Sequence, residues 1–375
     1  MLGVKRWDNT FLDAMRQVGD PLADAVVTEV VNSHGVGRVN EMMRSLVRND
    51  DLVPADMPAV VRDYLLETER LPDWADRDLI AQGERFFDFN WPIVVTLLFC
   101  ASLPSAYAAD KGAQVLYLTH RLTQRVHRRI FETAQFILDV MAPGGLSGEG
   151  RGIRSAQKVR LLHTAIRHFV EHVPEWRDQW DPAWGVPINQ EDLAGTMMTF
   201  SLQVLVGMKR FRMPTTAADE EAYLHAWKVV GHIIGIHDEL MPANVDEAYE
   251  LATTIFNRQR KPSQAGLDLT SALLAFMDGQ IRSRLFRGFP ATIMRNSIDA
   301  DVADMLQVPR ADWTTLLFRL EEVMLRALAR FELSQRQHSR LLQRFSYDLV
   351  QELVKIERGG DRSLFRIPPT LRAPI

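Results

Sequence analysis

The chain has 375 residues, 46% of them hydrophobic, which suffices for two or three average domains or for one large helical domain. Its formal net charge of −4 argues against a general affinity for nucleic acid. Cys100 is the single cysteine, so it excludes an intrachain disulfide and favours a reducing compartment.

Two segments, the N-terminus and residues 89–109, are candidates for an export signal or a membrane span, and neither has the expected pattern. The stretch Met1–Asp8 is charged, no apolar stretch follows it and no twin-arginine motif is present, so we expect a cytoplasmic protein. Residues 89–109 contain no charged side chain, but their dense apolar part runs only over 93–101. Because this part is too short to cross a bilayer, we expect a buried helix that ends at Leu103–Pro104.

Hydrophobic residues recur with the helical period along most of the chain, which predicts an all-α fold. We expect helices over residues 22–32, 36–48, 57–69, 77–87, 93–101, 112–142, 154–173, 190–212, 220–236, 245–260 and 267–281, and one or two over 313–357. Asn189 and Asn244 precede acidic first turns and are predicted N-caps. Pro143 and Pro174 fall just past two predicted helix ends.

The helix predicted over 154–173 carries an imidazole on its apolar face. The stripe has the spacing +4, +3, +4 and consists of Val159, His163, Ile166 and Val170. Taken alone, this histidine is most simply a core imidazole bonded to a backbone carbonyl.

The preceding helix has the same peculiarity. Its stripe places a guanidinium and a hydroxyl at core positions, in Leu122, Val126, Arg129, Thr133, Phe136 and Val140. Burying these groups without partners is unfavourable. The Gly-rich stretch 143–152 is predicted to be a flexible link that lets the two helices face each other across a pocket. A cofactor with both a metal and carboxylates would satisfy the imidazole, the guanidinium and the hydroxyl together.

Several short motifs in a fixed order resemble the family of latex-clearing proteins and mpaB-type oxygenases. They are Ser102–Tyr107, Arg128–Thr133, Lys158–Arg167, Pro187–Ala194 with Phe200, Ala222–Trp227 and Asp238–Pro242. The similarity spans about 86–255, with a fainter part to Pro309. It implies a globin-like helical core with additional N- and C-terminal helices and one noncovalent haem b. It further implies cleavage or oxidation of carbon–carbon double bonds in an isoprenoid or another apolar alkene with dioxygen.

The resemblance assigns roles to individual positions. His163 matches the proximal iron ligand, and Arg129 and Thr133 match the arginine and threonine on the distal side. Glu132 stands where latex-clearing proteins have a lysine that closes the sixth iron position, so an open or water-bound iron is expected. The family's glutamate base would fall near Ala113 by ungapped spacing, but it has no assigned counterpart in this sequence, which makes Glu132 a candidate substitute.

Two arginines flank His163 by helical angle. Arg160 and Arg167 could pair with haem propionates, or they could be solvated or ion-paired surface residues. We expect residues 1–290 to form the haem-binding domain and 291–375 a helical extension packed on it. Small apolar substrate and dioxygen are the expected partners, and the C-terminal helices could instead contact a second copy or a membrane surface.

Two other function classes stay open. His168-Phe-Val-Glu171-His172 fits a zinc-peptidase pattern and would make the chain a hydrolase. The imidazoles of His168 and His172 point away from His163 by helical angle, and no clear third metal ligand follows in the sequence. A haem sensor or carrier without turnover is the other class, because the family's base is missing.

Overall fold

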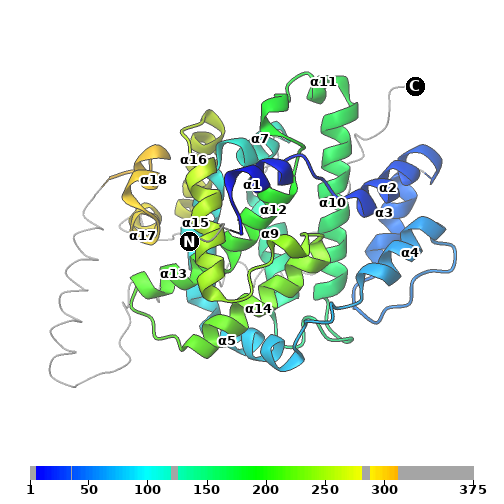
Figure 1. Ribbon diagram of the computed structural model, residues 1–375, viewed down its shortest axis with the longest axis horizontal. Helices are drawn as coiled ribbons and strands as arrows, with labels where there is room; N and C mark the ends of the chain where they lie inside the picture. Colours follow the sequence, from blue (N-terminus) through cyan, green and yellow to red (C-terminus); the bar gives the residue numbers. More distant parts are fainter. Residues whose placement is uncertain (1–5, 35, 120–125, 281–287, 311–375) are drawn as a thin grey trace.

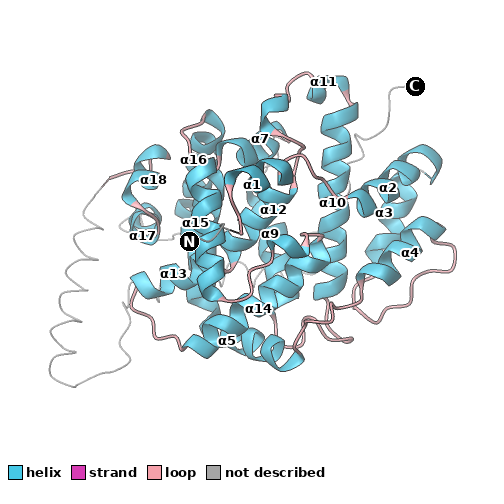
Figure 2. Ribbon diagram, viewed as in Figure 1, coloured by secondary structure: helices cyan, strands magenta, loops and turns pink. Residues whose placement is uncertain are grey.

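The structure of the protein, a computed structural model, describes residues 6–34, 36–119, 126–280 and 288–310. These residues form helices and loops, and their only β-type contact is an isolated bridge between Ala109 and Arg260 (Figure 2). The predicted all-α fold is therefore confirmed.

The N-terminal elements are α1 (Asn9–Met15), α2 (Pro21–Glu29), the π-helix η1 (Val30–His34), α3 (Val36–Ser45) and α4 (Ala59–Thr68). The middle of the chain forms α5 (Arg77–Leu97), the π-helix η2 (Leu98–Ser102), α6 (Leu103–Tyr107), α7 (Asp110–Leu118), α9 (Val126–Met141), α10 (Gly152–His172) and α11 (Pro174–Arg177). The remainder comprises η3 (Pro182–Trp184), α12 (Gln190–Phe200), α13 (Leu202–Arg210), α14 (Ala217–Ile234), η4 (Asp238–Leu240), α15 (Val245–Gln259), α16 (Gln264–Gln280), α17 (Phe289–Ser297) and α18 (Ala300–Met305).

Helix α10 separates two packing regions of the molecule. On one side it contacts α2, and α3 and α4 lie beyond (Figure 1). On the other side it contacts α9 and α14, which belong to the main hydrophobic core. Residues on opposite faces of α10 therefore meet different parts of the chain.

The helix that begins at Arg77 corrects two sequence predictions. We expected a break between 87 and 93 and an end at Leu103–Pro104, but the chain stays helical through α5, η2 and α6. Pro92 removes one helical donor, yet the following turns are buried in the core, and packing outweighs this loss. The segment from Arg77 to Tyr107 is long and apolar enough to span a membrane, but 67% of its apolar window is buried.

A close helix contact holds this segment in place. An added Cβ at Gly83 of α5 would lie 2.4 Å from the carbonyl oxygen of Ala222 in α14. Any larger residue would push the two helices apart. The tight α5–α14 pair forms one wall of the core.

Other predicted boundaries are partly correct. Asn189 accepts from the amide of Asp192 at 3.0 Å and Asn244 from that of Glu247 at 2.9 Å, which confirms both caps. The predicted helix over 190–212 is divided at Ser201 into α12 and α13. The predicted helix over 112–142 corresponds to α7 and α9, with 120–125 outside the described part of the chain.

The C-terminal part is described only to residue 310. Helices α17 and α18, which the sequence analysis missed, place Phe289, Ile293 and Val302 in the main core. The predicted helices over 313–357, and with them most of the extension 291–375, lie outside the described residues.

Candidate active site

A cavity of ≈ 360 Å³ lies between α9, α10, α12 and α14, with α6, α7 and α15 completing its wall. Its volume is typical of pockets for small organic ligands. Most of the wall is apolar, and includes Phe136, Leu162, Phe200, Trp227, Ile234 and Ile255. Phe200 and Trp227 stack with ring centroids 5.6 Å apart. The cavity can therefore hold an apolar molecule.

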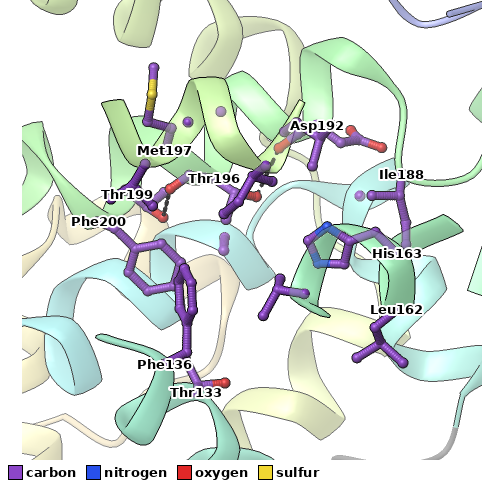
Figure 3. A pocket seen from close by; sticks show the side chains of 18 of the residues that line it. Thr133, Phe136, Leu162, His163, Ile188, Asp192, Thr196, Met197, Thr199 and Phe200 are labelled. Carbon is purple, nitrogen blue, oxygen red and sulfur yellow. Dashed lines mark hydrogen bonds between the residues drawn. The ribbon is translucent and has the colours of Figure 1, made fainter. Parts of the chain in front are cut away.

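His163 lies in this wall. Its neighbours on the predicted stripe, Val159 and Ile166, line the cavity as well. Figure 3 shows the imidazole extending from α10 towards the interior, with Phe136 and Phe200 across from it. The sequence prediction that this helix presents an imidazole to a shared pocket is consistent with this geometry.

Helix α9 supplies the opposing wall. Glu132 and Thr133 both line the cavity, so the structure brings these two predicted site residues to the same space as His163. The backbone of Arg129 belongs to α9, but its side chain lies outside the described part. A carboxyl and a hydroxyl thus share an apolar pocket with one imidazole, a set that can hold or move a proton beside a bound ligand.

The Gly-rich segment fixes the two helices against each other. We predicted a flexible link, but it is a hydrogen-bonded turn: Glu84 accepts the amide of Gly144 at 2.8 Å and that of Leu146 at 3.3 Å. Backbone atoms also crowd Gly150, where an added Cβ would lie 2.2 Å from the carbonyl oxygen of Gly144. The glycines therefore allow a compact connection.

The two arginines beside His163 point the other way. The guanidinium of Arg160 pairs with both carboxylate oxygens of Asp20, at 2.6 and 2.8 Å. Arg167 pairs with Asp24 and donates to the carbonyl of Ile188 at 2.9 Å. Neither arginine lines the cavity. Of the two alternatives, the structure favours ion-paired arginines.

One end of the cavity is charged, which the sequence analysis missed. Arg44, Arg151 and Lys158 line it together with Asp139. Burial raises the pKa of Asp139 to about 6, against hydrogen bonds from Gln135 and Ser155 that favour the carboxylate. Burial lowers the pKa of Lys158 to about 8, partly offset by Asp139. Lys158 directly precedes the apolar stripe, which is the only sequence signal for its position.

A second buried carboxylate stands at the α12 side. Glu191 is fully buried and accepts from Arg16 at 3.2 Å, Arg258 at 2.9 Å and Gln259 at 2.9 Å. This cluster joins the N-terminal segment to α12 and α15. Because its cations neutralise it, we assign it a structural role.

Three other histidines, His168, His172 and His225, have local partners. His225 accepts the amide of Asp76 at 2.9 Å and does not line the cavity. His168 and His172 stack on each other with ring centroids 4.2 Å apart. Within the described part of the chain, no three His, Cys, Asp or Glu side chains are grouped to hold a metal ion, so the zinc-peptidase pattern gains no support from the described structure.

A haem and a bare metal ion require different numbers of protein ligands. A bare metal ion needs several protein ligands, whereas haem iron already has four porphyrin nitrogens and needs one axial imidazole. Among its described lining residues, the cavity has one imidazole in an apolar wall. The residues present therefore fit a haem, which His163 would hold.

The fold and this site define an all-helical protein with an apolar ligand cavity and one imidazole in its wall. Residues 90–331 match the family described as ER-bound oxygenase mpaB/B'/rubber oxygenase, catalytic domain. The chain belongs to this oxygenase family.

A rubber oxygenase from Streptomyces sp. (strain K30) is 28% identical over 289 residues, which cover 77% of this chain and 70% of that protein. The solved structure of latex clearing protein LCP in the closed state superposes with a TM-score of 0.79 at 25% identity. It covers 94% of this chain and 95% of that one. The family predicted from the short motifs is thus confirmed.

Proposed function

We propose that this oxygenase binds one haem b through His163 and uses dioxygen to oxidise or cleave carbon–carbon double bonds of an isoprenoid or another apolar alkene. The observation that carries the proposal is the imidazole of His163 in the wall of an apolar cavity, in a chain of the mpaB and rubber oxygenase family. When bound, haem would supply the iron chemistry that activates dioxygen.

The chain's own residues would contribute binding and proton control. His163 would hold the iron. Glu132 and Thr133 face the same cavity and would place a carboxyl and a hydroxyl beside the reacting groups. Arg129, four residues before Thr133 on α9, is part of the same proposal. The apolar walls would hold the alkene and exclude water.

Haem binding is tested by adding haemin to purified protein and recording the absorption spectrum. We expect a Soret band for the wild type and for His172→Ala, whose ring lies outside the cavity wall, and none for His163→Ala. A wild type that takes up no haemin contradicts the proposal.

Turnover is tested with the holoprotein, dioxygen and squalene, with carbonyl products measured by mass spectrometry. We expect aldehyde or ketone fragments. A haem sensor or carrier is the second candidate, because the family's glutamate base has no assigned counterpart near Ala113, a buried alanine. A holoprotein that forms no carbonyl product from any polyene tested favours that candidate.

A further inference from the structure

The charged end of the cavity is built from segments that are distant in the sequence. Arg44 comes from α3, Arg151 is the N-cap residue directly before α10, and Lys158 lies in the second turn of that helix. The three side chains line the same cavity. The ammonium group of Lys158 donates to the carbonyl of Leu46, which holds the end of α3 against α10.

Positive charge exceeds negative charge at this end. Every arginine and lysine among the described lining residues belongs to this group of three. The carboxyl that faces them most directly is Asp139, whose burial favours its neutral form. Glu132, Glu191 and Asp192 also line the cavity. Glu132 lies seven residues before Asp139 on α9, about 10 Å away by helix rise, and Glu191 and Asp192 both pair with Arg16.

One nitrogen atom among the three cations has no hydrogen-bond acceptor in the described part of the chain. The Nε atom of Arg44 is buried, and none of the described groups bonds to it. A buried donor without an acceptor, next to a desolvated ammonium, is unfavourable. An anionic ligand group in the cavity would remove this penalty.

We propose that Arg44, Arg151 and Lys158 bind carboxylate groups of the cavity's ligand. The inference rests on the proposed function for the identity of that ligand: haem carries two propionates, and an oxidised isoprenoid could carry one carboxylate. Lys158 precedes His163 by five residues, about 7.5 Å of helix rise, so a ligand held at His163 and extending along α10 reaches these cations. Arg160 and Arg167, occupied by Asp20 and Asp24, do not serve this purpose.

The test compares ligands with and without carboxylates on apoprotein. Haemin and iron protoporphyrin IX dimethyl ester are titrated into the wild type, Arg151→Gln and the double variant Arg44→Gln/Arg151→Gln. We expect the double variant to bind haemin about 10- to 100-fold more weakly, since each charge-assisted hydrogen bond contributes strongly, and to bind the ester with unchanged affinity. Arg177→Gln, whose side chain is exposed on α11, is the matched control and should bind both like the wild type.

Farnesoic acid and farnesol, titrated into the protein and followed by tryptophan fluorescence, separate the two carboxylate sources. If the double variant loses affinity for farnesoic acid alone, the site serves an acidic ligand rather than the propionates. If it binds haemin and farnesoic acid as the wild type does, the inference is overturned. A wild type that binds neither porphyrin contradicts the proposed function, and the farnesoic acid titration then decides the inference by itself. Circular dichroism verifies that each variant is folded, and the exposed Arg151→Gln provides a readout should the double variant unfold.

Discussion

Polar side chains of α10 meet two opposite kinds of surroundings. Arg167 is buried and Arg160 is largely buried, and their guanidinium groups meet carboxylates and carbonyl oxygens. His163 and Lys158 instead line a cavity. A polar residue within an apolar helix face therefore indicates a ligand only where the tertiary structure leaves a space beside it. Where another helix supplies the opposite charge, the same pattern is structural.

The largest expected effect on stability comes from removing the ion pair between Arg160 and Asp20. Arg160→Met leaves Asp20 buried without its cation, and we expect the free energy of unfolding to fall by about 3–5 kcal/mol, measured by urea denaturation. The double variant Arg160→Met/Asp20→Asn should recover part of this loss, because no charge then stays unpaired. A large loss of haemin affinity in Arg160→Met at unchanged stability would contradict the contrast between the ion-paired arginines and the cavity-lining residues.

Asp139, which lines the cavity from α9, should make the stability of the apoprotein depend on pH. The folded-state pKa of Asp139 is raised from 3.8 to about 6. Asp139 therefore adds to the free energy of unfolding at low pH. This stabilising contribution is fully present below pH 3.8 and is lost as the pH rises through about 6, by at most ~3 kcal/mol. In Asp139→Asn apoprotein, we expect this decline between pH 4 and 6 to disappear from urea unfolding curves. An unchanged curve would show that Asp139 titrates normally.

The opposing wall of the cavity is tested by activity instead of stability. Glu132→Gln keeps the size of the side chain but removes its proton-transfer capacity, so we expect carbonyl product formation to fall by about 100-fold. The Soret band and the haemin affinity should be those of the wild type. Glu67→Gln, on α4 outside this cavity, is the matched control and should keep the wild-type activity. Equal activity of Glu132→Gln and wild type would remove Glu132 from the mechanism.

The smallest effects are expected at the two caps. Asn189 is fully buried and also donates to the carbonyl of Val186 and to Asp192, each at 2.9 Å, so Asn189→Ala should lower the free energy of unfolding by about 2 kcal/mol. Asn244 is exposed, and Asn244→Ala should lower it by about 0.5–1 kcal/mol. Thermal unfolding of the apoproteins measures the difference, and equal losses would show that the additional bonds of Asn189 contribute nothing.

Local patterns determined much of this protein. The apolar stripe predicted a helix over 154–173, and α10 runs from Gly152 to His172. The same stripe predicted that His163 faces a pocket with α9, because side chains three and four residues apart share one helix face. Both asparagine caps followed from residues within one turn. These features depend on near neighbours in the chain, which the sequence displays directly.

Only the tertiary structure decided which charges find partners. Asp20 lies 140 residues from Arg160, and no periodic pattern connects them. Arg44 reaches the cavity from α3, and the helix that begins at Arg77 continues through Pro92 because its later turns are buried. Burial and ion pairing depend on contacts between segments distant in the sequence, and their free energies exceed the local preferences that a helical period or a proline expresses.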